Sequence, residues 1–104
     1  MTQTRLKHSY HDSEITSVEC REDGSLTLGV ELCSCSDVPG AQVHLVFCDV
    51  RNLSEVRAAL NAAMARWKNR GPRIIGIVKE GHRRHLLDLD TGEVWVDAKT
   101  VLET

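Results

Sequence analysis

Hydrophobic and polar residues alternate along the first half of the chain. The alternation is clearest over residues 26–32 and 42–50, where hydrophobic side chains occupy every second position. A period of two places one set of side chains on a buried face of a strand and the other set on the opposite face. The pattern predicts two β-strands here, and residues 14–21 predict a third strand that precedes them.

A turn signal joins the first two of these strands. Gly24 can adopt the positive φ of a tight turn, and a three-residue loop there makes the flanking segments a hairpin. In that register Val18 lies opposite Leu28 and Cys20 lies opposite Leu26, with all four side chains on the hydrophobic face. We therefore predict an antiparallel hairpin that continues into a third strand.

The hydrophobic period changes to about 3.6 residues after the third strand. The apolar residues that recur at helical spacing are Leu53, Val56, Leu60, Ala63, Met64 and Trp67. Ser54 is placed to cap the N-terminus of a helix, and the Gly71-Pro72 pair stops it near Arg70. The pattern predicts one helix over residues 54–70 that packs its apolar stripe, Trp67 included, against the sheet.

The last third of the chain predicts further strands. Residues 74–78 are apolar on both faces, as expected of a buried central strand. Residues 85–89 and 93–96 flank a turn at 90–92 and predict a second hairpin. Residues 98–104 either extend that hairpin or form a short helix. The sequence thus predicts an α+β fold with about six antiparallel or mixed strands, in the order β-β-β-α-β-β-β, and one helix on one face.

The chain has the size and composition of one folded domain. It contains 104 residues, of which 41% are hydrophobic and 27% are charged, values that are ordinary for globular proteins. Residues 1–12 show no hydrophobic period and are expected to form a flexible tail, so that residues 13–104 make up the domain. The first residues lack an apolar segment, which argues against a signal peptide or membrane span and favours a cytoplasmic protein.

Charge is divided unevenly along the chain. Residues 66–85 carry seven arginine and lysine side chains against one glutamate, whereas the remainder carries six basic and fourteen acidic side chains. Such a basic segment favours anionic ligands or self-association. The candidate anion-binding residues are Arg70, Arg73, Lys79, His82, Arg83, Arg84 and His85. Nucleic acid is not the favoured ligand, because the pI is near 6.2 and the only aromatic residue of the segment, Trp67, is assigned to the core.

Four cysteines raise the possibilities of metal binding and disulfides. In the predicted pairing Cys33, Cys35 and His44 share a face, with Cys33 about opposite His44, and they are weak candidates for a metal site. Cys48 lies about 13 Å further along the strand, so a fourth ligand is missing and no metal or other cofactor is expected. No pair of cysteines is well placed for a disulfide, and Cys20 faces the other side, so reduced thiols are expected.

The residues do not specify a reaction. Nothing orients His44 as a base toward the neighbouring thiols, and the chain contains no phosphate-binding loop or dinucleotide fingerprint. Enzymatic activity is therefore not favoured. A single helix leaves the second face of the sheet uncovered, with Val46, cysteines and one side of 74–78 on it. This face favours a protein-interaction module that forms a homodimer or binds a protein partner. The alternative is anion or nucleic-acid binding through residues 66–85.

The opening of the chain resembles that of small uncharacterised bacterial domains, some of them immunity-protein-like. The likeness is carried by His11-Asp12-Ser13-Glu14-Ile15, by Val18-Glu19, by the turn at Gly24 and by the alternating strand that follows. It covers the first third of the chain. The resemblance implies a protein-binding role without catalysis.

Overall fold

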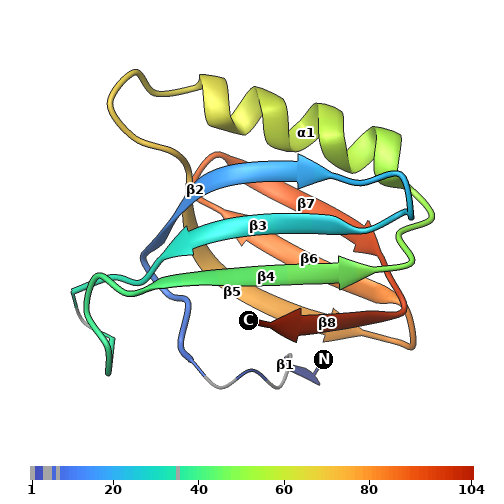
Figure 1. The fold of residues 1–104 in the computed structure, drawn as a ribbon, viewed down its shortest axis with the longest axis horizontal. Helices are drawn as coiled ribbons and strands as arrows, with labels where there is room; N and C mark the ends of the chain where they lie inside the picture. The colour runs from blue at the N-terminus through green and yellow to red at the C-terminus, as the bar shows by residue number, and fades with distance from the viewer. Residues whose placement is uncertain (1, 4–5, 7, 35) are drawn as a thin grey trace.

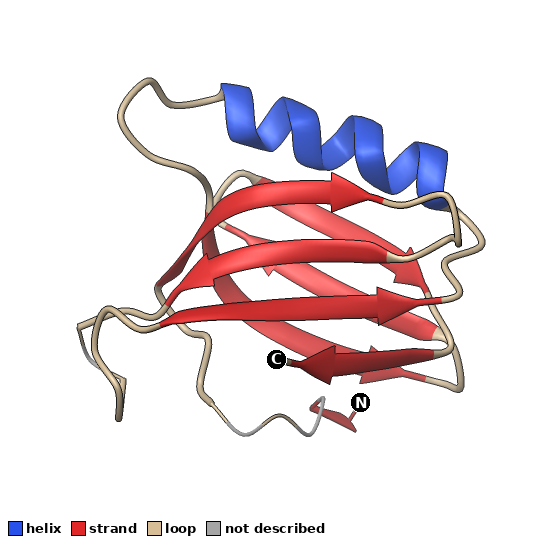
Figure 2. Cartoon of the chain, in the orientation of Figure 1, coloured by secondary structure: helices blue, strands red, loops and turns tan. Residues whose placement is uncertain are grey.

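The computed structural model describes residues 2–3, 6, 8–34 and 36–104, and it shows an α+β fold (Figures 1 and 2). The elements of the described chain are β1 (Thr2–Gln3), β2 (Ser13–Cys20), β3 (Leu26–Glu31), β4 (Gln42–Cys48), α1 (Leu53–Ala65), β5 (Arg73–Glu80), β6 (Arg84–Leu89), β7 (Gly92–Asp97) and β8 (Thr100–Glu103). Within the described residues all strand pairs are antiparallel and follow the order β7-β6-β5-β2-β3-β4-β8, with β1 paired to β5 off this path. The predicted fold class is confirmed in outline, with two more strands than the six expected.

The sheet bends so that its two halves face each other. In Figure 1 β2, β3, β4 and β8 form the front half, and β5, β6 and β7 form the rear half. The halves are joined where Ser13 pairs with Ile74 and Glu14 pairs with Arg73. One hydrophobic cluster fills the space between them, and α1 packs against β2 of the front half and β7 of the rear half. The helix therefore closes the side of the molecule on which the two halves are not paired.

The predicted register of the first hairpin is confirmed. Val18 pairs with Leu28 and Cys20 pairs with Leu26, as a three-residue loop at Gly24 requires. Leu26 and Leu28 are fully buried, whereas Val18 and Cys20 are half-buried. Fully burying such an aliphatic side chain contributes about 1.5–3 kcal/mol, so the alternating strands are the main source of the core's stability.

The helix is shorter than the sequence predicts. It ends at Ala65 instead of near Arg70, and Asn52 rather than Ser54 occupies its N-cap position. Trp67 therefore lies beyond the helix and is 40% exposed, so its assignment to the core is wrong.

A close approach between the following loop and β2 explains the early helix end. The N–H of Gly71 donates to the Glu14 carboxylate at 3.1 Å, and the N–H of Ile15 donates to the Pro72 carbonyl at 2.9 Å. A Cβ at Gly71 would lie 2.0 Å from the Ile15 carbonyl oxygen, so only glycine fits there. The chain must leave the helix early enough to reach this contact and begin β5.

Both ends of the chain contribute to the structure. The last residues form β8, which pairs with β4, so the strand alternative for residues 98–104 is the one observed. Tyr10, in the segment expected to be a flexible tail, is 5% exposed, and its hydroxyl donates a 2.5 Å hydrogen bond to the Glu103 carboxylate. Burial and this carboxylate raise the pKa of the Tyr10 hydroxyl. Leu6 also packs against the core. In the part of the chain that is described, no helix has the length and apolar character to cross a membrane.

Candidate functional site

The candidate anion-binding residues do not converge on one site. Arg70 and Arg73 lie at the beginning of β5, and Lys79 lies six residues further, about 20 Å along a strand. His82, Arg83 and Arg84 follow at that distant end, in the turn to β6 and at its start. The basic segment is therefore divided between the two ends of the sheet.

Several of these cations already have partners. Arg70 pairs with Asp90 at 3.0 Å, and the guanidinium of Arg84 stacks over the Trp95 ring at 4.2 Å from its centroid. Arg83 donates to Asp97 at 2.6 Å and to the carboxylate and carbonyl oxygens of Asp49 at 3.2 and 2.6 Å. The hydrogen bond to Asp97 is the main reason why the pKa of Arg83 is raised. These contacts connect the hairpins of the fold and leave less charge for an external anion.

His85, a candidate anion-binding residue, lies in the core. It is 2% exposed, its ring meets Phe47 edge to face at 6.0 Å between centroids, and its Nε2 lies 3.2 Å from the Ala98 carbonyl oxygen. Its Nδ1 is buried without a hydrogen-bond partner. Burial lowers the pKa of the imidazole, so His85 is held neutral in the fold and is not a ligand for a dissolved anion.

The weak metal candidates are not brought together in the described residues. His44 pairs with Gly29 rather than lying opposite Cys33, because β3 ends at Glu31, before Cys33. Cys33 is disulfide-bonded, which contradicts the expectation of reduced thiols at this position, whereas Cys20 and Cys48 are free. Cys35 lies outside the described residues. No group of three metal-ligating side chains is present among those described.

A depression of about 540 Å³ lies over the outer side of β3 and β4. It holds the free thiol of Cys48 and the imidazole of His44, but these residues are four apart on one strand, about 13 Å. The imidazole is too distant to take a proton from the thiol. The charged groups at the rim are occupied locally, since Arg21 pairs with Glu19 at 3.4 Å and Asp23 accepts a 2.7 Å hydrogen bond from Ser25.

The large exposed hydrophobic residues are spread over several elements of the described chain. Four large hydrophobic residues are at least 40% exposed, and they lie on four separate segments of the sequence: Val38, Trp67, Ile75 and Leu102. Val46, which the sequence placed on the uncovered face, is half-buried. Val46 pairs with the exposed Leu102 of β8, so these two side chains form a small apolar contact on this face.

A groove of about 250 Å³ runs between α1 and β7. Its lining residues are Ala59, Ala62, Ala63 and Arg66 from the helix side and Thr91, Gly92, Glu93 and Val94 from the strand side. α1 and β7 run in opposite directions (Figure 1), so the C-terminal end of the helix lies beside the start of the strand. The alanines have short side chains, which lets another peptide backbone approach the helix closely.

The strand that borders this groove has an incompletely paired edge. β7 is the last strand at one end of the described sheet, so every second residue directs its N–H and C=O away from β6. At Trp95 and Asp97 these outward groups are partly used: the Asn52 carboxamide donates to the Trp95 carbonyl and accepts from the Asp97 N–H, both at 2.9 Å. The N–H of Arg51 donates to the Asp97 carbonyl at 2.8 Å.

The outward groups at the other half of the edge lack such partners among the described residues, although α1 packs against β7. By the same alternation the N–H and C=O of Glu93 also point outward, as does the N–H of Trp95. None of the three forms a hydrogen bond with another described residue. Glu93 lines the alanine-lined groove, and Trp95 follows two residues further along β7. An extended peptide could pair with them as an additional strand.

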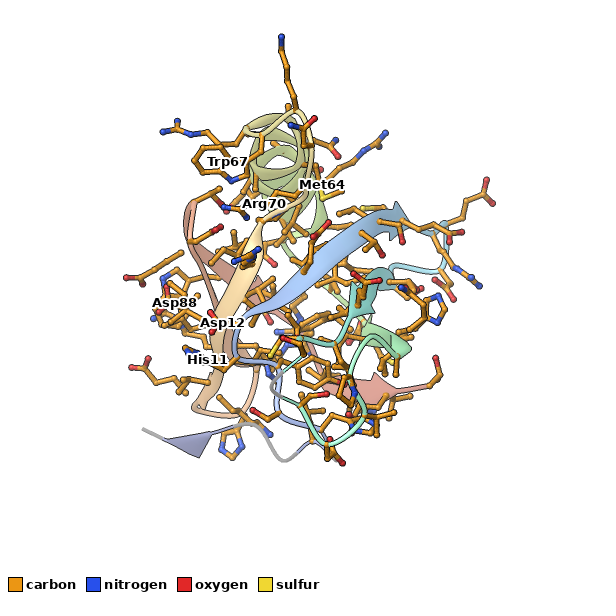
Figure 3. The ribbon with its side chains drawn as sticks, turned by 90° about the vertical axis from the view of Figure 1, so that its left-hand side faces the viewer. His11, Asp12, Met64, Trp67, Arg70 and Asp88 are labelled. Atoms are coloured by element: carbon orange, nitrogen blue, oxygen red, sulfur yellow. The ribbon has the colours of Figure 1, made fainter. Side chains whose placement is uncertain are left out.

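An exposed tryptophan follows the groove residue Arg66 and contacts two arginines. The guanidinium carbons of Arg66 and Arg70 are 5.6 and 4.9 Å from the centroid of Trp67. Figure 3 shows Trp67, Arg70 and Met64 gathered at the C-terminal end of α1. Arg70 is held by Asp90, whereas Arg66 forms no ion pair with a described residue. Tryptophan and arginine are the side chains most enriched at the energetic centres of protein interfaces.

Sequence reasoning missed this groove although one signal was present. Ala58, Ala59, Ala62, Ala63 and Ala65 leave much of the helix surface without large side chains. That pattern indicates where another backbone can come close. It does not indicate which strand lies beside the helix, since this depends on the strand order.

No protein-family model, curated protein or solved structure matches this chain, so the likeness of its opening to immunity-protein-like domains stays an expectation.

Proposed function

We propose that this protein is a non-enzymatic interaction module that binds an extended segment of another protein along β7, in the groove beside α1. The observation that carries the proposal is the set of unpaired outward groups on β7, namely the N–H and C=O of Glu93 and the N–H of Trp95. A row of such groups on a terminal strand is a template for an added strand. The groove beside them supplies room for the side chains of that strand.

The open edge is short, which limits what backbone pairing can contribute. Three hydrogen bonds at about 0.5–1.5 kcal/mol each give roughly 1.5–4.5 kcal/mol. Binding in the millimolar range already requires about 4 kcal/mol. Contacts in the groove, over the alanines and toward Trp67, must therefore supply most of a useful affinity. We expect specificity to come from the side chains that enter this groove.

The charge and capping of β7 argue against a second copy of the chain as the partner. A two-fold pairing of β7 with itself centred on Glu93 places two glutamates directly opposite each other, which is repulsive. A pairing centred on Val94 needs the Trp95 carbonyl as an acceptor, and this carbonyl is already bonded to Asn52. The proposal is therefore a segment of a different protein rather than a homodimer.

Anion binding through residues 66–85 has weaker support. Arg70 and Arg83 are held by carboxylates, and His85 is in the core. The remaining cations of the segment lie at opposite ends of β5.

A peptide selection with groove variants tests the proposal. Peptides are selected from a random display library on the full chain, and their affinities are measured for Ala62→Gln, which fills the groove at an exposed helix position. Ala58→Gln is the matched control, because it makes the same change at an exposed helix position that does not line the groove. We expect Ala62→Gln to weaken binding at least tenfold and Ala58→Gln to leave it within twofold.

A second variant tests the backbone pairing itself. Glu93→Pro removes an outward N–H, a change that an edge strand tolerates because this group does not face β6. We expect a further loss of peptide binding, with circular dichroism and the melting temperature reporting that the fold is kept. Selected peptides that bind Ala62→Gln and folded Glu93→Pro as tightly as the original chain would overturn the proposal.

A further inference from the structure

We infer that the segment bound along β7 carries an acidic side chain at the end of the groove formed by Arg66. This inference rests on the proposed strand addition and specifies the chemistry of the partner. Arg66 is exposed, lines the groove, and forms no ion pair with any described residue. An aspartate or glutamate of the partner is the group that its guanidinium can bind through two parallel hydrogen bonds.

The position of Arg66 fixes where the acidic residue belongs. It lies at the C-terminal end of α1, beside Thr91 and Gly92, whereas Ala59 lines the groove on the other side of Ala62. Residues that point the same way along a strand are about 6.6 Å apart. A small side chain over Ala62 is therefore followed, in the same row, by a side chain that reaches Arg66. The selected segments should share this spacing.

The charge around this end of the groove is complementary to a carboxylate. Arg66 is the arginine among the residues that line the groove, and it is exposed. Asp90 is occupied, because it accepts from Arg70 at 3.0 Å and from the N–H of Arg73 at 3.0 Å. The carboxylate that opposes an acidic ligand is that of Glu93, on the strand side of the groove.

Trp67 gives the same end of the groove an apolar surface. Its ring is 40% exposed and lies against the guanidinium of Arg66, with the carbon of that group 5.6 Å from the ring centroid. A partner side chain that binds Arg66 thus has its methylene groups near the ring. We expect this pairing of an aromatic face with an arginine to favour glutamate over aspartate.

A charge reversal tests the inference. Peptide libraries are selected in parallel on the original chain, on Arg66→Glu and on Lys68→Glu, a control that makes an equal charge change at an exposed position outside the groove lining. We expect Asp or Glu to be enriched at one fixed position with the original chain and with Lys68→Glu. Arg66→Glu should select Lys or Arg at that position and should bind the original acidic peptides at least tenfold more weakly.

Two further measurements separate the possible failures. Arg66→Gln should give an intermediate loss, and binding of the acidic peptide should weaken between 50 and 500 mM NaCl. Peptides that depend on the groove, as judged by Ala62→Gln, but show no preference for an acid and no response to Arg66→Glu would overturn this inference and leave the proposed function standing. Selected peptides that are indifferent to Ala62→Gln would overturn both.

An oligonucleotide serves as the competing probe. A single-stranded 20-mer tests whether Arg66, Lys68 and Arg73 instead bind phosphates. We expect no binding that responds to Ala62→Gln. Oligonucleotide binding that is abolished by Arg66→Glu, together with no acidic preference among the peptides, would reassign this surface to nucleic acid and overturn the inference.

Discussion

The two ends of β7 differ in how their outward backbone groups are hydrogen-bonded. At the end near Asp97, side-chain and backbone groups of Asn52 and Arg51 bind the outward groups of the strand as a neighbouring strand would. At the end near Glu93, the outward groups have no partner among the described residues and border a groove. An edge strand that is fully open invites uncontrolled pairing. Closing one half and leaving three groups free restricts pairing to a short segment that must also fit the groove.

We expect the largest effect on stability at the end of β7 near Asp97, the closed end, whose outward groups bind Asn52 and Arg51. Asn52→Ala leaves the Trp95 carbonyl and the Asp97 N–H without their partners in a half-buried site. We expect this to lower the free energy of unfolding by about 1–3 kcal/mol, the cost of unsatisfied buried groups. Urea unfolding measures the change. Asn61→Ala is the matched control, because Asn61 is exposed on the helix and forms no hydrogen bond with a described residue.

Amide hydrogen exchange measures the difference between the two ends of β7 at single residues. In the original chain the Asp97 amide should be protected by its bond to Asn52, while the Glu93 and Trp95 amides exchange quickly. Asn52→Ala should bring Asp97 to the rate of Trp95. Equal protection of all three amides in the original chain would show that the two ends are alike and would remove the basis of the comparison.

Much of the fold follows from local sequence signals. The register of β2 and β3 could be predicted because Gly24 and a three-residue loop fix it locally. The register of β3 and β4 could not be predicted: the sequence places Cys33 about opposite His44, whereas His44 pairs with Gly29. Instead the N–H of Leu32 donates to the Ala41 carbonyl, and the N–H of Gly40 donates to the Leu32 carbonyl. The loop is therefore closed by backbone hydrogen bonds, which cannot be predicted from the residue types.

The candidate site depends on long-range arrangement and was not predictable for that reason. The groove exists because β5 pairs with β2, which places β7 at the end of the sheet and α1 beside it. Neither pairing has a local signature in the sequence. The helical period also runs through Trp67, and only the contact of Gly71 with Ile15 explains why the helix stops before it. The sequence shows that residues 66–85 are basic, but their distribution over the two ends of β5 follows from the length of the strand.

Low pH should lower the stability of the fold through His85, which lies at the closed end of β7. We expect this effect to be smaller than that of Asn52→Ala near neutral pH. His85 pairs with Val96, and its Nε2 lies against the Ala98 carbonyl, so it is packed directly under that end. Burial lowers its pKa below 6.5, and the nearby Lys79 and Arg83 act in the same direction, whereas the Ala98 carbonyl and Asp97 oppose it. Below pH 6.5 the unfolded chain then binds a proton at this histidine that the folded chain does not.

Stability should therefore be complete above about pH 6.5 and should fall as the pH decreases through that value toward the lowered pKa. His85→Phe keeps an aromatic ring against Phe47 and removes the titration, so its stability should change less between pH 7 and pH 5. His82→Phe makes the same change in the exposed turn and should keep the slope of the original chain. Parallel slopes in all three proteins, measured by urea unfolding, would show that His85 is not the group responsible.

At the open end we expect the smallest effect on stability, because the Trp67 ring there is exposed. Trp67→Ala removes an exposed ring and its cation–π contacts with Arg66 and Arg70. Such contacts contribute about 0.5–1 kcal/mol at exposed sites, so we expect a loss of less than about 1 kcal/mol. A core tryptophan, which the helical period predicts here, would cost about 3–5 kcal/mol on the same substitution. Urea unfolding of Trp67→Ala distinguishes the two values. A small loss of stability together with a large loss of peptide affinity would place Trp67 in the binding surface. A loss of about 3–5 kcal/mol would instead show that Trp67 is a core residue and not part of a binding surface.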